Sequence, residues 1–451
     1  VSGMAAGDAT AQVSAADYRR AANMLGDRTA PLVDGAVRGE RWLDDGSLVY
    51  ASSAQGKTAW LRFDPVSGKT AAAFDQRALA DAMTLASGGK GKPADADKLT
   101  VFAVKRDGEA LVLSVPGGDF RCDAAGCTAR AAATVATGSE PGAASPDGKR
   151  AAFIRDWNLW LRDLASGKET QLTFDGKPDY GYATDNAGWK HTDAAILVWS
   201  PDGRKIATFQ QDQRKTSSMT LVATNVGAPK AEQWKYPFVG DEHVTMIERV
   251  IIDLSADSPR TIRLQLPPDQ HRSTCSDDLE CSEGWEDVQW ARDGKTLAFV
   301  STDRGHKSAT LRVADAATGK VRDVFTETVA TQYQSAPALD SVNWRYLPES
   351  GEFLWFSQKS DWGHLYLHDL VTGKEKRQLT RGDWNVARLR HLDPVSRTLW
   401  FEGVGRETGR DPYFVHYYKI GLDGGDVTLL TPENAHHAIT PRHAHRLALR
   451  R

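Results

Sequence analysis

The sequence lacks any long apolar run. The longest obvious one, residues 194–199, has six residues, whereas a membrane-spanning helix needs about 18 or more. A surplus of positive charge is also missing, since 56 lysines and arginines stand against 59 aspartates and glutamates. The sequence therefore predicts neither a membrane span nor a nucleic-acid partner, which would require a basic surface.

Cysteine is scarce. Four cysteines occur, as the close pairs Cys122 with Cys127 and Cys275 with Cys281. The even count and the local spacing predict two small-loop disulfides and hence an oxidising compartment. One zinc site built from all four thiolates is an alternative, but four and five intervening residues differ from the usual two. Unpaired thiols are the third interpretation.

The familiar catalytic signatures are missing too. Neither Gly-x-Ser-x-Gly nor His-Glu-x-x-His occurs. Gly-Lys-Thr is found at Gly56, Gly68 and Gly294, but the first glycine of a phosphate-binding loop is replaced each time. The histidine-rich stretch 436–445 is interpreted as a solvated basic end. We therefore predict no metal site and no cofactor, and no nucleophile–base pair can be named.

What the sequence does contain is a repeat, Asp-x-x-(Ser/Thr)-Gly-Lys, at Asp64–Lys69, Asp163–Lys168, Asp315–Lys320 and Asp369–Lys374. Glycine at its fifth position supplies a positive φ, and the aspartate can accept hydrogen bonds from the turn's amides. A second turn lies about 16 to 22 residues upstream of each copy, at Asp45, Asp147, Asp293 and Ser350. Each unit therefore reads as strands joined by two turns.

The spacing of the hexapeptides predicts the fold class. Successive copies are 99, 152 and 54 residues apart, which fit two, three and one periods of about 50, as in a β-propeller. We expect an all-β, seven- or eight-bladed β-propeller over residues 31–440. An N-terminal arm, residues 1–30, carries a short helix over 13–25, and residues 441–451 form a basic His/Arg-rich tail.

Smaller features complete this expectation. A second short helix is predicted over residues 75–85, followed by a polar loop over 88–97. Most tryptophans are interpreted as packing in or between blades, namely Trp157, Trp160, Trp199, Trp290, Trp344 and Trp355. Residues 179–191 are instead an insertion, rich in aromatic and polar groups, that a bare blade does not need. Such loops on a rigid scaffold are typical binding sites.

An ordered set of motifs resembles the N-terminal propeller of the dipeptidyl peptidase IV branch of the prolyl oligopeptidase serine peptidases. It comprises Ser-Pro-Asp-Gly turns at Ser145 and Ser200, Asp156–Trp160, Gln171–Thr173, the Tyr-Pro-x-x-Gly element within 234–240, and the helix over 13–25. The resemblance implies a periplasmic or secreted protein. It also implies peptide substrates, a C-terminal α/β-hydrolase domain with a Ser-Asp-His triad, and a homodimer as partners.

The resemblance also implies a binding role. In that family the propeller gates access to the hydrolase and binds the substrate's free amino end through a glutamate pair in Asp-Trp-x-Tyr-Glu-Glu-Glu. Residues 179–185 match this stretch, and Asp185 alone keeps a carboxylate there. Asp185 is thus the candidate ammonium ligand, with Tyr182, Thr184 and Trp189 around it. One exposed carboxylate gives a weaker contact than two, so strict dipeptidyl specificity is not expected.

A hydrolase domain would need about 200 to 250 further residues. The strand pattern stops after Thr440, which we interpret as a truncation or a change of reading frame, and we expect the chain alone to be inactive. The alternative is a stand-alone periplasmic propeller that binds or scaffolds partners. A propeller enzyme acting on sugars would need paired carboxylates, but Asp241–Glu242 and Glu286–Asp287 are interpreted as turn and surface charges.

Overall fold

The computed structural model describes residues 13–29, 32–88, 92–130, 142–184, 195–224, 227–256, 258–270, 287–334 and 342–438. The chain divides into two compact units, unit 1 with residues 1–139 and 440–451, and unit 2 with residues 140–439. The predicted tail 441–451 lies outside the described residues.

The helical segments of the described residues are short: α1 (Ala15–Ala22), α2 (Gly26–Thr29), α3 (Gln76–Ala86), and the 3₁₀ turns η2 (Ala96–Lys98) and η3 (Pro348–Ser350). The Ser14 hydroxyl accepts from the amide of Asp17, and the Asp17 carboxylate accepts from the amide of Ser14. This capping box confirms the helix of the N-terminal arm. The Asp75 carboxylate caps α3 by accepting from the amides of Arg77 and Ala78, which confirms the second helix.

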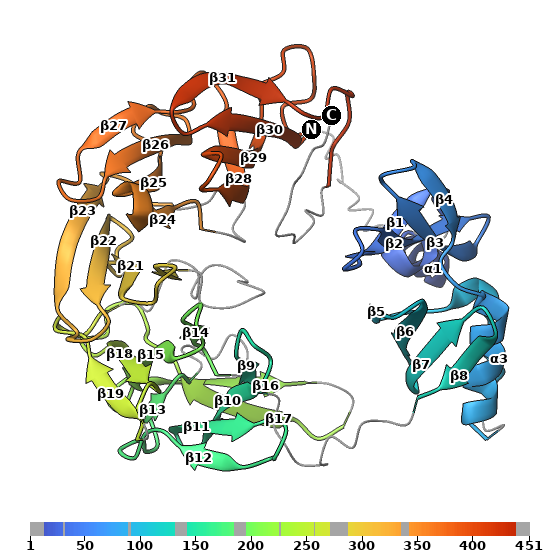
Figure 1. The fold of residues 1–451 in the computed structure, drawn as a ribbon, viewed down its shortest axis with the longest axis horizontal. Helices are drawn as coiled ribbons and strands as arrows, with labels where there is room; N and C mark the ends of the chain where they lie inside the picture. The colour runs from blue at the N-terminus through green and yellow to red at the C-terminus, as the bar shows by residue number, and fades with distance from the viewer. Residues whose placement is uncertain are drawn as a thin grey trace, which may run out of the picture. The chain divides into compact units, whose positions relative to one another are not determined.

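Unit 1 contains two antiparallel four-stranded sheets, which we call the first and second blades (Figure 1). The first has β1 (Ala36–Trp42), β2 (Leu48–Ala54), β3 (Lys57–Asp64) and β4 (Lys69–Ala72). The second has β5 (Ala103–Asp107), β6 (Ala110–Val115), β7 (Gly118–Asp123) and β8 (Gly126–Ala129). Trp60, Leu79 of α3 and Leu113 share one buried core between these elements.

Unit 2 contains the third to seventh blades (Figure 1). The third has β9 (Ala143–Ala144), β10 (Arg150–Arg155), β11 (Asn158–Asp163) and β12 (Glu169–Gln171). The fourth has β13 (Tyr180–Tyr182), β14 (Val198–Trp199), β15 (Lys205–Asp212), β18 (Met246–Asp253) and β19 (Arg260–Arg263). A separate hairpin, β16 (Ser218–Ala223) and β17 (Lys230–Lys235), is inserted between β15 and β18.

The last three blades are regular. The fifth has β20 (Val288–Trp290), β21 (Thr296–Thr302), β22 (Ser308–Asp315) and β23 (Val321–Thr328). The sixth has β24 (Arg345–Leu347), β25 (Glu352–Ser357), β26 (His364–Asp369) and β27 (Glu375–Gln378). The seventh has β28 (Asn385–Asp393), β29 (Thr398–Val404), β30 (His416–Gly421) and β31 (Gly424–Leu429).

Every copy of the hexapeptide forms the turn between the third and fourth strands of a blade, as predicted. In the fifth blade the Asp315 carboxylate accepts from the Thr318 amide at 2.8 Å and the Thr318 hydroxyl at 2.7 Å. Gly319 then adopts φ 72°, which glycine tolerates at little cost. The upstream turns join the first and second strands, so each unit has four strands.

Seven blades are present in the described part of the chain, which confirms the all-β propeller class and resolves its blade count. The 152 residues between the second and third hexapeptides hold two periods, not three. Residues 250–266 do not form a unit of their own, because β18 and β19 belong to the fourth blade. The inserted hairpin and the insertion after β13 account for the extra residues between these two hexapeptides. Dividing the spacing by the period therefore overestimates the number of blades.

The cores lie between neighbouring blades. Ala152 of the third blade and Val250 of the fourth, for example, belong to one buried cluster. Trp344 and Trp355 are fully buried between the fifth and sixth blades, as predicted. Two predictions were wrong: Trp157 is 42% exposed, and Asp287 is completely buried with the Trp344 indole 3.5 Å from its carboxylate. Asp287 is therefore no surface charge.

Candidate functional site

The candidate site surrounds β13, the short strand that carries Tyr182. β13 pairs with the end of β15, through Tyr180 opposite Asp212 and Tyr182 opposite Gln210, while β14 pairs with the start of β15. One edge of the fourth blade is thus shared by two short strands, and the chain between them includes most of the predicted binding segment. Of the predicted site residues, Tyr182 and Thr184 are described together here. Asp185 and Trp189 lie outside the described residues.

The Tyr182 side chain is only 1% exposed. Its hydroxyl donates to Asp175 Oδ1 at 2.7 Å and accepts from Arg263 Nη2 at 3.1 Å. Burial, together with the hydrogen bond to Asp175, holds the pKa of Tyr182 far above its usual range. The phenol therefore stays protonated and fixes the end of β13 against β19.

Arg263 connects two carboxylates around these tyrosines. Its guanidinium lies 3.2 Å from Asp175 Oδ2 and 2.8 Å from Glu248 Oε2. Burial alone would lower the pKa of Arg263, but the surrounding tyrosines and carboxylates outweigh it and raise the pKa. The Tyr180 hydroxyl lies 3.4 Å from the other oxygen of Glu248. One permanent cation thus neutralises part of a small acidic cluster.

A second cation covers the ring of Tyr180. The guanidinium of Arg214 lies 4.3 Å from the ring centroid, within the range of a cation–π contact. Arg214 also makes a two-pronged ion pair with Asp212 at 2.6 and 2.9 Å. Because Arg214 donates these hydrogen bonds, the pKa of Asp212 is lowered. The face of Tyr180 is therefore already occupied.

Thr184 follows β13, and both Thr184 and Trp157 of the β10–β11 turn approach Gly181. The Thr184 hydroxyl is 3.5 Å from the Gln211 amide nitrogen. A Cβ placed on Gly181 would lie 2.8 Å from the Thr184 methyl and 3.1 Å from the Trp157 ring. Glycine is thus required at 181, because Trp157 and Thr184 both approach the backbone there.

Sequence reasoning missed several residues of this cluster. Tyr180 lies within the predicted segment and Asp175 lies shortly before it, and both carry polar or aromatic groups, so the composition argument could have included them. Glu248 and Arg263 carry no local signal, since they come from β18 and β19 and reach the site only through blade pairing.

The structure confirms one predicted disulfide. Cys122 and Cys127 are bonded and lie opposite each other on β7 and β8. This excludes the four-thiolate zinc site, which would need both as free thiolates. Cys275 and Cys281 lie outside the described residues. Over the described part of the chain, no group of three or more metal-ligating side chains is assembled.

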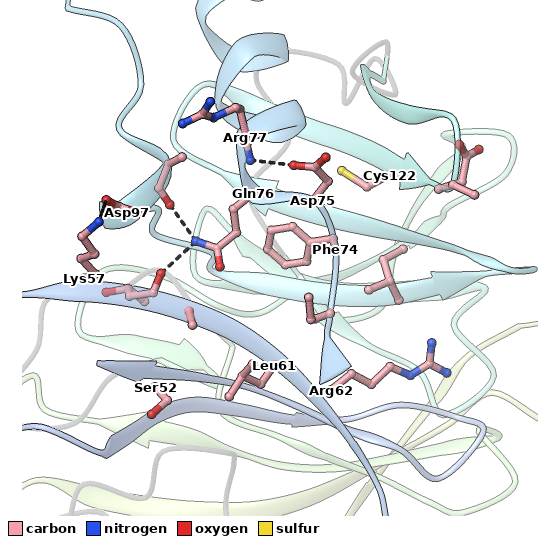
Figure 2. Close-up of a pocket in the computed structure, with 18 of the residues that line it drawn as sticks. Ser52, Lys57, Leu61, Arg62, Phe74, Asp75, Gln76, Arg77, Asp97 and Cys122 are labelled. Carbon is pink, nitrogen blue, oxygen red and sulfur yellow. Dashed lines mark hydrogen bonds and ion pairs between the residues drawn. The ribbon is translucent and has the colours of Figure 1, made fainter. Parts of the chain in front are cut away.

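Unit 1 contains a separate pocket of about 1060 Å³, between the first and second blades (Figure 2). Its lining includes Leu61, Phe74 and Leu111. Figure 2 shows the Gln76 amide nitrogen donating to the carbonyl oxygens of Thr58 and Ala96, at 2.9 and 2.7 Å. Gln76 therefore fastens α3 to β3 and η2, and its polar groups are used structurally rather than presented to a ligand.

Comparison with known proteins identifies the family. The model of the dipeptidyl peptidase IV N-terminal region matches residues 130–448, more than half of the chain. The chain belongs to the dipeptidyl peptidase IV N-terminal family. The match covers the whole candidate site around β13, so this site lies within the family domain and is not an addition to it.

Named relatives agree with this family. Dipeptidyl peptidase 4 of Arthroderma otae is 24% identical over 300 residues, 62% of this chain and 35% of that protein. Dipeptidyl-aminopeptidase B of Aspergillus niger is 24% identical over 310 residues, 64% of this chain and 32% of that protein. The chain thus spans about a third of the length of the curated relatives it matches.

A solved structure supports the fold. The crystal structure of Porphyromonas gingivalis dipeptidyl peptidase 4 aligns with a TM-score of 0.54 at 16% identity, covering 91% of this chain and 55% of that one. As a member of the dipeptidyl peptidase IV N-terminal family, the chain has the expected propeller fold. In the described residues, no helix combines the length and the apolar character needed to cross a bilayer.

Proposed function

We propose that this chain is the substrate-gating propeller of a dipeptidyl peptidase IV-like serine peptidase and binds the free amino end of peptides. The observation that carries the proposal is the edge of the fourth blade that β13 and β14 share. There β13 is fixed by the Tyr182–Asp175–Arg263 contacts, and it lies within residues 179–185, the segment that resembles the family's ammonium-binding motif. A rigid anchor of this kind positions the polar residues that follow it.

In this proposal Asp185 supplies the charge that attracts a peptide's ammonium group, and Thr184 and Trp189 flank it. Tyr182 has a supporting part, because its ring is buried and its hydroxyl is already bonded twice. The described carboxylates of the cluster are paired with arginines, so they are poor competitors for the ammonium group.

The partners follow from the same proposal. We propose that the propeller comprises residues 31–440 and works with a C-terminal α/β-hydrolase domain, whose serine would attack the peptide carbonyl with histidine as the base. A homodimer remains a prediction, to be checked by sedimentation velocity. The Cys122–Cys127 disulfide supports a periplasmic or secreted location, because such bonds persist in oxidising compartments.

Calorimetric titration of the 451-residue chain tests this function. The peptides are tri-alanine, which has a free ammonium group, and N-acetyl-tri-alanine, which has none. We expect the chain to prefer tri-alanine, and Asp185→Asn to weaken that binding about two- to fivefold, as the loss of one exposed ion pair does. Binding of the acetylated peptide should not change.

The matched control is Asp323→Asn, which removes an exposed carboxylate on β23 and should leave the titration unchanged. Equal affinity of the wild-type chain for both peptides, or no binding of either, would contradict an amino-end recognition site. The stand-alone scaffold would then be the better interpretation.

A further inference from the structure

The β10–β11 turn contains an unusual residue choice. Arg155 pairs with Asn158, so Asp156 and Trp157 alone make the turn, with φ of 48° and 61°. Turns of this geometry favour asparagine and glycine, because a side chain in this region clashes with its own backbone. The corresponding turn of the first blade uses Gly56 at its second position. A tryptophan here needs support from its surroundings.

The surroundings are built to hold Trp157. Its carbonyl oxygen accepts from the Tyr182 amide at 2.9 Å, which connects the turn to β13. A Cβ on Gly176 would lie 2.2 Å from that same oxygen, and a Cβ on Gly181 would lie 3.1 Å from the indole ring. Two glycines therefore make room for Trp157, which is fixed against the strand that anchors the proposed site.

Part of the indole nevertheless faces solvent, since Trp157 is 42% exposed. The ring and the Thr184 methyl group both flank Gly181, so the exposed indole lies next to the point where the chain leaves β13. A half-exposed aromatic ring on a rigid turn presents contact area at little entropic cost.

The electrostatics of this region leave the indole available to a cation. Asp175 and Glu248 are paired with Arg263, while Arg214 already lies over Tyr180. Within the described residues, by contrast, no cation stacks on Trp157. The face of an indole attracts ammonium groups more strongly than the face of any other aromatic side chain.

We propose that the exposed face of Trp157 is a specificity-determining contact that binds the N-terminal ammonium group of the peptide through a cation–π interaction. This inference rests on the proposed function and adds to it a residue from the preceding blade. The third blade then contributes an aromatic contact to the proposed site.

The experiment is the titration of the 451-residue chain with tri-alanine and N-acetyl-tri-alanine, extended to three variants of Trp157. We expect Trp157→Ala and Trp157→Leu to weaken tri-alanine binding about three- to tenfold and to leave the acetylated peptide unaffected. Leucine keeps apolar packing on Gly181 without an aromatic face. Trp157→Phe, which keeps a ring, should lose less than leucine does.

Trp362→Ala is the matched control, because Trp362 is 37% exposed and lies in the β25–β26 turn of the sixth blade. It should change neither titration. The cation–π contact is overturned if Trp157→Leu binds tri-alanine as tightly as wild type, or if it weakens the binding of both peptides equally. In either case the proposed function stands as long as the wild-type chain prefers tri-alanine. A wild-type chain without that preference would overturn both.

Discussion

Gly373 and Gly167 occupy the same position of the repeated hexapeptide but have different surroundings. Both have a positive φ, 70° and 72°, because the turn requires it. A Cβ on Gly373 would lie 2.2 Å from the carbonyl oxygen of Val324 in the fifth blade, whereas a Cβ on Gly167 would meet nothing within 4 Å. The positive φ of the turn therefore favours glycine at both positions. At Gly373 the close approach of Val324 also excludes a side chain.

The two glycines allow conformational strain to be separated from steric strain. We expect Gly167→Ala to lower the free energy of unfolding by about 1 kcal/mol, the cost of a side chain at positive φ. Gly373→Ala should cost about 3 kcal/mol, because the sixth blade must also move away from Val324. Urea denaturation of both variants gives the difference. Equal losses would show that the contact relaxes without cost.

The hexapeptide turn is the element that recurs through the fold. In all four copies the pKa of the first aspartate is lowered. In the fifth blade this happens mainly because the Thr318 hydroxyl and amide donate to Asp315. An aspartate whose folded pKa is lowered stabilises the protein above its unfolded pKa, and this contribution disappears as the pH falls through the folded value.

We therefore predict that the stability difference between wild type and Asp315→Asn shrinks on acidification. It should be less than about 1 kcal/mol at pH 6, since the carboxylate is exposed, and should be lost as the pH falls through the lowered folded pKa of Asp315, below which the carboxyl group is protonated in both states. Urea denaturation across this range measures it. Thr318→Val is the control, because without the hydroxyl the pH dependence should become weaker. A difference that grows on acidification would contradict the argument.

At the scale of the whole molecule, the chain contains the propeller of the dipeptidyl peptidase IV N-terminal family. It spans about a third of the curated relatives it matches, and its sequence contains no Gly-x-Ser-x-Gly. Covalent catalysis requires a nucleophile within hydrogen-bond reach of a base. The family match thus accounts for the scaffold that carries the candidate binding residues, whereas catalysis has to be measured directly.

We expect the purified chain to bind tri-alanine without cleaving it. Mass spectrometry of a long incubation should recover the intact peptide, because binding alone supplies neither an activated nucleophile nor a general base. The prediction would be contradicted if alanine or dialanine were released and if a serine-directed fluorophosphonate abolished that release. A preparation treated with the reagent before the peptide is added serves as the control for contaminating peptidases.

Much of this protein was determined by the sequence itself. The hexapeptide turns, the Ser14 capping box, α3 and the Cys122–Cys127 bond depend on contacts between residues fewer than seven positions apart. Short-range contacts of this kind have a small loop-closure cost, so local residue types specify them. The propeller class followed as well, because the repeat copies one local pattern.

Tertiary structure alone decided the blade count and the composition of the site. Asp175 meets Arg263 across 88 positions of the chain, and the exposure of Trp157 depends on glycines of a neighbouring loop and blade. Such contacts arise because β18 pairs with β15 and β19 pairs with β18, which brings side chains of separate segments together. Local residue types do not specify which distant strands pair. The sequence therefore specified the turns, whereas the packing of the blades assembled the site.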